Sequence, residues 1–141
     1  MVLHNTYGNA ARRAFAGIIN DLGDATTTIN VALLDVTHTP DLSAHEVFAD
    51  VSVDEVSGTG YTAGGEEVTT KTLTETSLVT TFDGDDVAWT DSTISAGYAV
   101  VYEATSGSLL TLVDFEGEQS SENGTFEVSW HADGIFTATA N

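Results

Sequence analysis

The sequence predicts a mainly β fold, an antiparallel β-sandwich or small barrel with one N-terminal α-helix. Three observations favour this class. From residue 26 onward β-branched residues dominate, in short runs that alternate with polar residues. Turn-forming segments separate these runs, and one stretch near the N-terminus carries an apolar stripe at helical period. Short alternating strands between frequent turns are typical of two-layer β proteins.

One domain over residues 1–141 is expected, because 141 residues are the size of one domain and no linker or repeat interrupts the chain. The helix is predicted over about 7–22, "YGNAARRAFAGIINDL", with Gly23 as its stop. Its apolar residues share one face, which we expect to pack on the β body. They are Ala11, Phe15, Ile18, Ile19 and Leu22.

The β-rich body is expected to cover about 26–139. Residues 26–35, "TTTINVALLD", alternate in the manner of a strand, and a short helical turn at 44–49 is suggested by Ser43 followed by Glu46. Ala99 to Tyr102 are apolar on both faces, which indicates a covered central strand. Further strands are predicted at 66–75, 77–82, 86–90, 93–103, 109–116, 124–130 and 134–139.

Two segments carry hairpin signals. "EATSGSLL" joins the apolar run that ends near residue 103 to the one that begins near 109. Asn123-Gly124 is the dipeptide that a type I′ turn prefers, because both positions need a positive φ. Both are therefore predicted to be hairpin turns.

The charge is the unusual feature of the composition. The chain has 22 acidic residues against Arg12, Arg13 and Lys71, a formal net charge of −19, and the acids are spread over almost every segment. Such repulsion strains a compact fold unless a positive partner, many cations or concentrated salt screens it. The even spread favours the solvated surface of a halophilic protein. Without a basic stripe, nucleic-acid binding is excluded.

Cysteine is absent, which excludes a disulfide framework, a thiolate nucleophile and a cysteine-ligated zinc site. No apolar run reaches the length of a membrane span or a signal peptide core. We therefore expect a protein that is made in the cytoplasm and does not insert into a membrane.

Residues 55–68, "EVSGTGYTAGGEEV", match the spacing of a dinucleotide-binding loop through Gly58, Gly60 and Ala63. Such a loop needs a helix after it, whose N-terminus faces the pyrophosphate. Here a Val- and Thr-rich stretch without a helical stripe follows. The glycines are interpreted instead as a tight loop around Tyr61, whose ring anchors on the core.

Asp83, Asp85 and Asp86 are the best metal candidates, since oxygen-rich clusters suit Ca²⁺ or Mg²⁺. The EF-hand pattern fails, because its sixth and twelfth positions hold Ala88 and Ile94. We expect an acidic β-turn between two strands there. No cofactor is predicted beyond unspecific cations.

The histidines and tryptophans offer no catalytic pattern. His45-Glu46 begins like the zinc motif H-E-x-x-H, but residue 49 is Ala. His38 and His45 flank Pro40 and are expected in an exposed loop. A Ser-His-Asp triad stays open, although no G-x-S-x-G elbow is present. Trp89 and Trp130 lie in strand-like patterns, which favours the core over a sugar-binding platform.

Three stretches together resemble a family of small proteins of tailed viruses, which are encoded among the virion structural genes, often near the major capsid protein. The stretches are "INVALLDVTHTPDLSAHEVFADVSVDEVSGTGYTAGG", "DDVAWTDSTISAGYAVVYE" and "LVDFEGEQSSENGTFEVSWHADGIF". The resemblance covers roughly residues 10–136. It implies a virion component that is not an enzyme. Members often have an Arg before the "YAV" tract, where this chain has Gly97.

Combined with the acidic surface, the resemblance implies a virion protein of a tailed virus with a halophilic, haloarchaeal host. A head position is expected, as a capsid decoration or the base of a vertex turret or fibre, with a tail or baseplate position and a host-surface or sugar-binding module as alternatives. The expected partners are the major capsid protein, neighbouring virion proteins and further copies in a trimer or pentamer. The predicted contact residues lie in the N-terminal segment and the 37–50 loop: Leu3, Tyr7, Arg12, Arg13, His38 and His45.

Overall fold

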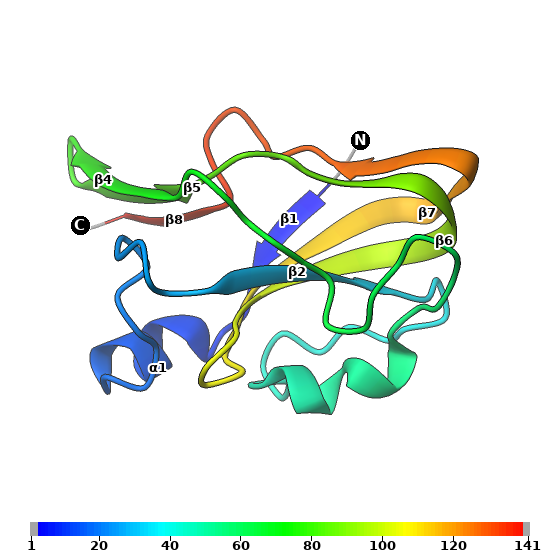
Figure 1. Ribbon diagram of the computed structural model, residues 1–141. Coiled ribbons are helices and arrows are strands. Elements are labelled where there is room, and N and C mark those ends of the chain that lie inside the picture. The colour runs from blue at the N-terminus through cyan, green and yellow to red at the C-terminus, as the bar shows by residue number, and fades with distance from the viewer. Residues whose placement is uncertain (1–2, 140–141) are drawn as a thin grey trace.

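The computed structural model describes residues 3–139 and shows two antiparallel sheets in a sandwich-like arrangement, so the predicted fold class is confirmed (Figure 1). The five-stranded sheet has the order β1-β7-β6-β2-β3, and the three-stranded sheet has the order β4-β5-β8. The elements are β1 (Leu3–Thr6), α1 (Ala10–Phe15), β2 (Ile29–Leu34), β3 (Glu66–Glu67), β4 (Thr72–Thr76), β5 (Val79–Asp83), β6 (Val87–Glu103), β7 (Leu109–Val128) and β8 (Phe136–Thr139), with 3₁₀ turns at Phe48–Asp50 and Ser52–Asp54.

The backbone of the fold is the β6–β7 ribbon, two paired strands of 17 and 20 residues. Four separate strands were predicted over this region, but each strand here runs on through bulges. The pairing register shifts at several points, and Asp91 and Glu116 adopt positive φ. Bulges of this kind bend a strand and increase its twist. The ribbon therefore curls back over the sheet at the right of Figure 1.

The two predicted hairpin turns differ in outcome. Residues 104–108 do connect β6 to β7, with Gly107 at a φ of +74°, as predicted. The hairpin at Asn123-Gly124 was wrong, because Gly124 pairs with Ser92 inside the same ribbon. The positive φ that the dipeptide predicts is present, since Asn123 has a φ of +47°. The backbone uses it for a bulge instead of a reversal.

The core lies on both faces of the five-stranded sheet. In β2, Val31 and Leu33 belong to a first cluster with Trp89 and Phe82, while Leu34 belongs to a second cluster with Tyr102 and Leu109. The same division holds in β6, where Ala99 and Val101 face the first cluster and Val100 faces the second. The expectation of a covered central strand at 99–102 is confirmed.

The N-terminal helix is much shorter than predicted. α1 has six residues, and the chain leaves it through Gly17, whose φ is +72°. Of the predicted apolar stripe only Ile19 is buried, whereas Phe15 is 94% exposed. A mid-segment glycine weakens a helix and readily takes the left-handed conformation, which explains the early stop. The residues before α1 form β1 on the edge of β7, which the sequence pattern did not predict.

The 37–54 segment covers the second cluster with turns. The predicted capping pair of Ser43 and Glu46 is absent: Asp41 Oδ1 accepts the amides of Ser43 and Ala44, and Asp50 Oδ2 accepts those of Glu46 and Val47. Helical turns therefore begin at residue 48 and not at 44. Phe48 stacks on Tyr102 at 4.3 Å between ring centroids, which fastens this segment to β6.

Candidate functional site

The glycine-rich loop at 58–65 is packed against two strands. A Cβ on Gly65 would lie 1.8 Å from the carbonyl oxygen of Val31, and one on Gly58 would lie 2.4 Å from that of Thr93. Strand β3 follows directly at Glu66. The glycines therefore allow close approach of backbones, and the helix that a pyrophosphate site requires is replaced by a strand.

Tyr61 anchors this loop as predicted. Its ring lies 5.7 Å from that of Trp89, and its hydroxyl donates to Glu55 Oε1 at 2.7 Å while it accepts the Leu33 amide at 3.0 Å. Glu55 also accepts the Gly64 amide at 2.6 Å. Burial raises the pKa of Tyr61, so its hydroxyl stays protonated and keeps donating.

The three aspartates at 83–86 point to different partners. Asp83 Oδ1 accepts the Gly84 amide, Asp85 Oδ2 accepts the Thr70 hydroxyl and Asp86 Oδ1 accepts the Trp130 amide. Over residues 3–139 no group of three or more His, Asp or Glu side chains is placed to hold a metal ion. The expected β-turn was also wrong, because β5 and β6 belong to different sheets and residues 84–86 cross between them.

His38 is buried and not exposed as expected. Its side chain is 1% exposed, and its Nδ1 lies 2.6 Å from Asp54 Oδ2. Its ring packs 5.7 Å from His45 and edge-on against Tyr98 at 5.5 Å. In a neutral imidazole whose Nδ1–H donates to the carboxylate, Nε2 is an acceptor. Within the described part of the chain, His38 Nε2 and His45 Nδ1 have no hydrogen-bond partner.

The contact between His38 and Asp54 ties together the two ends of the 37–54 segment. Neither residue lines the hollow that is formed by β7. Sequence reasoning missed Asp54 and Tyr98, since separations of 16 and 60 residues carry no motif. Their role in the structure is to fix the segment that follows Pro40.

Glu103 is the one fully buried carboxylate among the acidic residues of β6. It accepts hydrogen bonds from the amides of Ser106 and Thr105 at 2.8 and 3.1 Å and from Asn20 Nδ2 at 3.1 Å, and a further one from the Ser106 hydroxyl. Burial acts to raise the pKa of Glu103, but these hydrogen bonds outweigh it and hold the pKa below its usual value. The charged carboxylate thereby closes the turn between β6 and β7.

Several exposed acids accept hydrogen bonds within their own turns. The pKa values of Asp24, Asp35 and Asp41 are lowered because each carboxylate accepts a backbone amide two or three residues ahead. All three are exposed. Hydrogen bonds within these turns thus stabilise the ionised form of the three exposed carboxylates.

The two predicted contact regions lie side by side. The Gly8 amide donates to Leu42 O at 2.7 Å, and Arg12 pairs with Glu46 at 3.1 Å. Arg13 is largely buried, with its Nε 2.7 Å from the Ser108 hydroxyl. The N-terminal segment and the 37–50 loop therefore form one surface, which we call the N-terminal face.

Two predicted contact residues do not contribute side chains to this face. Tyr7 is 1% exposed and packs in the second core cluster, where burial raises its pKa. His38 is buried as well. The side chain of Leu3 lies outside the described residues. The exposed members are Arg12 and, unpredicted, Phe15 and Ile18.

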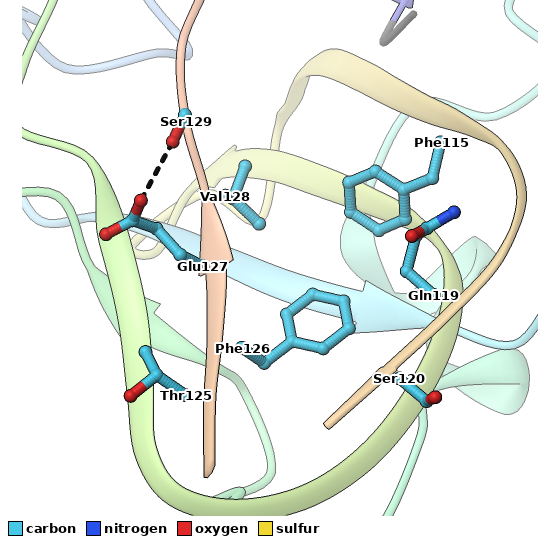
Figure 2. A pocket seen from close by; sticks show the side chains of 8 residues that line it. All are labelled: Phe115, Gln119, Ser120, Thr125, Phe126, Glu127, Val128 and Ser129. Carbon is cyan, nitrogen blue, oxygen red and sulfur yellow. Dashed lines mark hydrogen bonds between the residues drawn. The ribbon is translucent and has the colours of Figure 1, made fainter. Parts of the chain in front are cut away.

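A hollow of about 470 Å³ lies where β7 doubles back on itself (Figure 2). Phe115 and Gln119 come from one limb of the strand and Phe126 and Glu127 from the other. The two phenyl rings stand 5.8 Å apart at 62° and form the apolar floor. The side chain of Glu127 turns to the rim, where it accepts the Ser129 hydroxyl at 3.0 Å.

The structure explains why residue 97 is a glycine. A Cβ at this position would lie 2.5 Å from the Cα of Val36, so no side chain fits without a backbone shift. An arginine, or any other side chain, at position 97 would therefore have no room. Neither family models, curated proteins nor solved structures show a match to this chain. No helix within residues 3–139 is long and apolar enough to cross a membrane.

Proposed function

We propose that this chain is a structural subunit of the particle of a tailed virus with a halophilic host, and that it belongs to the head, bound to the major capsid protein or a neighbouring virion protein. The observation that carries the subunit role is the N-terminal face. Phe15 is 94% exposed there beside Arg12, in a chain with three basic residues. A large aromatic side chain next to a rare cation is typical of a protein-binding surface.

A second surface supports the role of a building block. The sheet of β4, β5 and β8 extends at the left of Figure 1, and every residue of β4 is exposed. Its end carries Leu78, which is 63% exposed. A strand that is open on both faces can accept a neighbouring chain along its edge. The virus class and the head position rest on the resemblance and the acidic composition.

The sugar-binding alternative needs an open aromatic face to stack on a sugar ring. Trp89 does not offer one, because it is 2% exposed.

Cryo-electron microscopy of the virion tests the proposal directly. We expect the two-sheet fold to fit density on the head lattice or at its vertices, with the N-terminal face against a neighbour. Density in the tail or baseplate would refute the head position, and absence of the chain from purified particles would refute the virion role.

The halophilic part has its own test in the isolated protein. At about 3 M KCl the Debye length falls to below about 3 Å, so repulsion among the carboxylates largely vanishes. We expect the free energy of unfolding to be higher by at least about 3 kcal/mol than at about 0.1 M KCl, measured by urea denaturation. Equal stability at both salt concentrations would contradict the proposal.

A further inference from the structure

We propose that the chain assembles with itself head to tail, by inserting Phe15 of one copy into the β7 hollow of the next. This inference deepens the subunit role proposed above by naming the partner as a second copy. It makes no use of the virus or of the head position. It can therefore fail or succeed on the isolated chain alone.

The inserted group is defined by the end of α1. Gly17 turns the chain away at a φ of +72°, so Phe15 stands out at the last helical position. Ile18 beside it is 40% exposed, and the Arg12 side chain is 56% exposed. Aromatic residues and arginine are both enriched in protein–protein interfaces.

The receiving site is the hollow within β7 (Figure 2). A cavity of about 150 Å³ holds a benzene molecule, so about 470 Å³ has room for one phenyl ring. Phe115 and Phe126, which are 8% and 5% exposed, form the floor of the hollow, against which a third ring can pack edge-to-face. Val128 completes the apolar lining.

The charges of the two surfaces are complementary. Glu127 stands on the rim of the hollow, and Glu118 and Glu122 are exposed on the same strand, although they do not line the hollow. Carboxylates gain favourable electrostatic energy beside Arg12, whereas almost any other face of this acidic molecule would repel them. In concentrated salt this attraction is screened, while burial of the ring is retained. Phe15 is thus expected to supply the affinity and Arg12 the orientation.

The two surfaces lie at opposite ends of the molecule, with α1 at the left and the curl of β7 at the right of Figure 1. A contact between different patches is heterologous, so an open assembly of any length keeps one unused Phe15 at one end and one unused hollow at the other. Repetition of the contact then yields a closed ring or an open chain. The trimer or pentamer expected from the sequence is such a ring.

The test uses two variants that each lose one half of the contact. F15S removes the ring, and S120W fills the hollow from its exposed limb, with T125W as a second filling variant at the other limb. In about 3 M KCl, light scattering after size exclusion should show an oligomer for the wild type and a monomer for each variant. V53S is the matched control, since Val53 is 86% exposed elsewhere, and it should remain oligomeric.

The decisive arm is an equimolar mixture of F15S and S120W. S120W retains Phe15, which can enter the open hollow of F15S. No further contact is possible, so the mixture should contain dimers with one copy of each variant. A symmetric contact between like patches would not give this result. A mixture that stays monomeric, variants that keep the wild-type mass, or a wild type that is monomeric at its highest soluble concentration would each overturn the inference.

Failure here is distinguishable from failure of the proposed function. A monomeric chain found on the head by cryo-electron microscopy would keep the virion role and refute self-assembly. A chain that forms rings but is absent from the particle would support self-assembly and refute the virion role.

Discussion

The glycine-rich loop at 58–65 and the N-terminal segment at 10–18 behave in opposite ways. The loop looked like a ligand site by its spacing, yet its glycines touch the backbones of β2 and β6 and its Tyr61 is tied to Glu55. The N-terminal segment looked like a buried helix, yet it ends after six residues and leaves Phe15 in solvent. The glycine-rich loop, which carries a ligand-binding motif, is packed against strands. The N-terminal segment, which carries the pattern of a buried helix, is largely exposed to solvent.

The difference shows what local patterns report. Both regions obey their local chemistry, since Gly60, Gly64 and Gly65 adopt positive φ and Ala10–Phe15 are helical. What the patterns do not report is which surface meets which, because that depends on strands far away in the sequence. Substitutions in the two regions should therefore differ sharply in their effect on folding.

The largest effect is expected for Gly65→Ala. The new methyl group would lie 1.8 Å from Val31 O, at a φ of +82°, so overlap and backbone strain add. We expect a loss of about 4 kcal/mol or more in the free energy of unfolding, measured by urea denaturation. Gly64→Ala is the matched control. Its φ is +93° but its nearest neighbour, Tyr102 Oη, is 3.5 Å away, so only the strain of about 1–3 kcal/mol should appear. Equal losses in both variants would show that the close approach to β2 is unimportant.

Glu103→Gln should cost about 2–3 kcal/mol, because charged hydrogen bonds are lost and an amide group faces backbone donors. The effect should depend on pH. The pKa of Glu103 is lowered in the folded state, so its stabilisation is complete above the ordinary carboxylate pKa of about 4 and is lost as pH falls through the lowered value. Wild type and variant should thus converge in acid. A difference in stability that stays constant from neutral pH down to acid unfolding would contradict this role of the charge.

Asp54→Ala should cost about 1–2 kcal/mol, since it leaves His38 Nδ1 buried without its acceptor. Asp133→Ala is the control, because Asp133 pairs with His131 at 3.3 Å in a largely exposed position. Exposed ion pairs contribute little, so its effect should stay below about 0.5 kcal/mol. Thermal unfolding of both variants checks the contrast. Similar losses would mean that burial of the His38–Asp54 pair does not matter.

Fold class could be predicted because alternation and turn residues are local. Ala99 to Tyr102 were assigned to a covered strand correctly, and so was the turn at 104–108. The continuity of β6 and β7 could not be predicted, since a positive φ at Asn123 suits a bulge as well as a hairpin. Only the pairing of Gly124 with Ser92 decides between the two.

The site residues were less accessible to sequence reasoning. Asp54, which meets His38, stands 16 residues away from it with no spacing rule to mark it. The hollow combines Phe115 with Phe126, which are brought together by the curl of one strand. Phe15 was assigned to the core because its period matched, and the early stop at Gly17 overrode that period.

The smallest effect on folding is expected for Phe15→Ser. Because the ring is 94% exposed, it makes few packing contacts within its own chain. The free energy of unfolding of the monomer should therefore change by less than about 0.5 kcal/mol. Ile19→Ser is the matched control from the same segment, and at 8% exposure it should cost about 2–3 kcal/mol. Urea denaturation at low protein concentration separates folding from any self-association. A loss for Phe15→Ser as large as that for Ile19→Ser would contradict the exposed position of the ring, because loss of an exposed side chain should cost little. Negligible loss would leave the ring free for another chain.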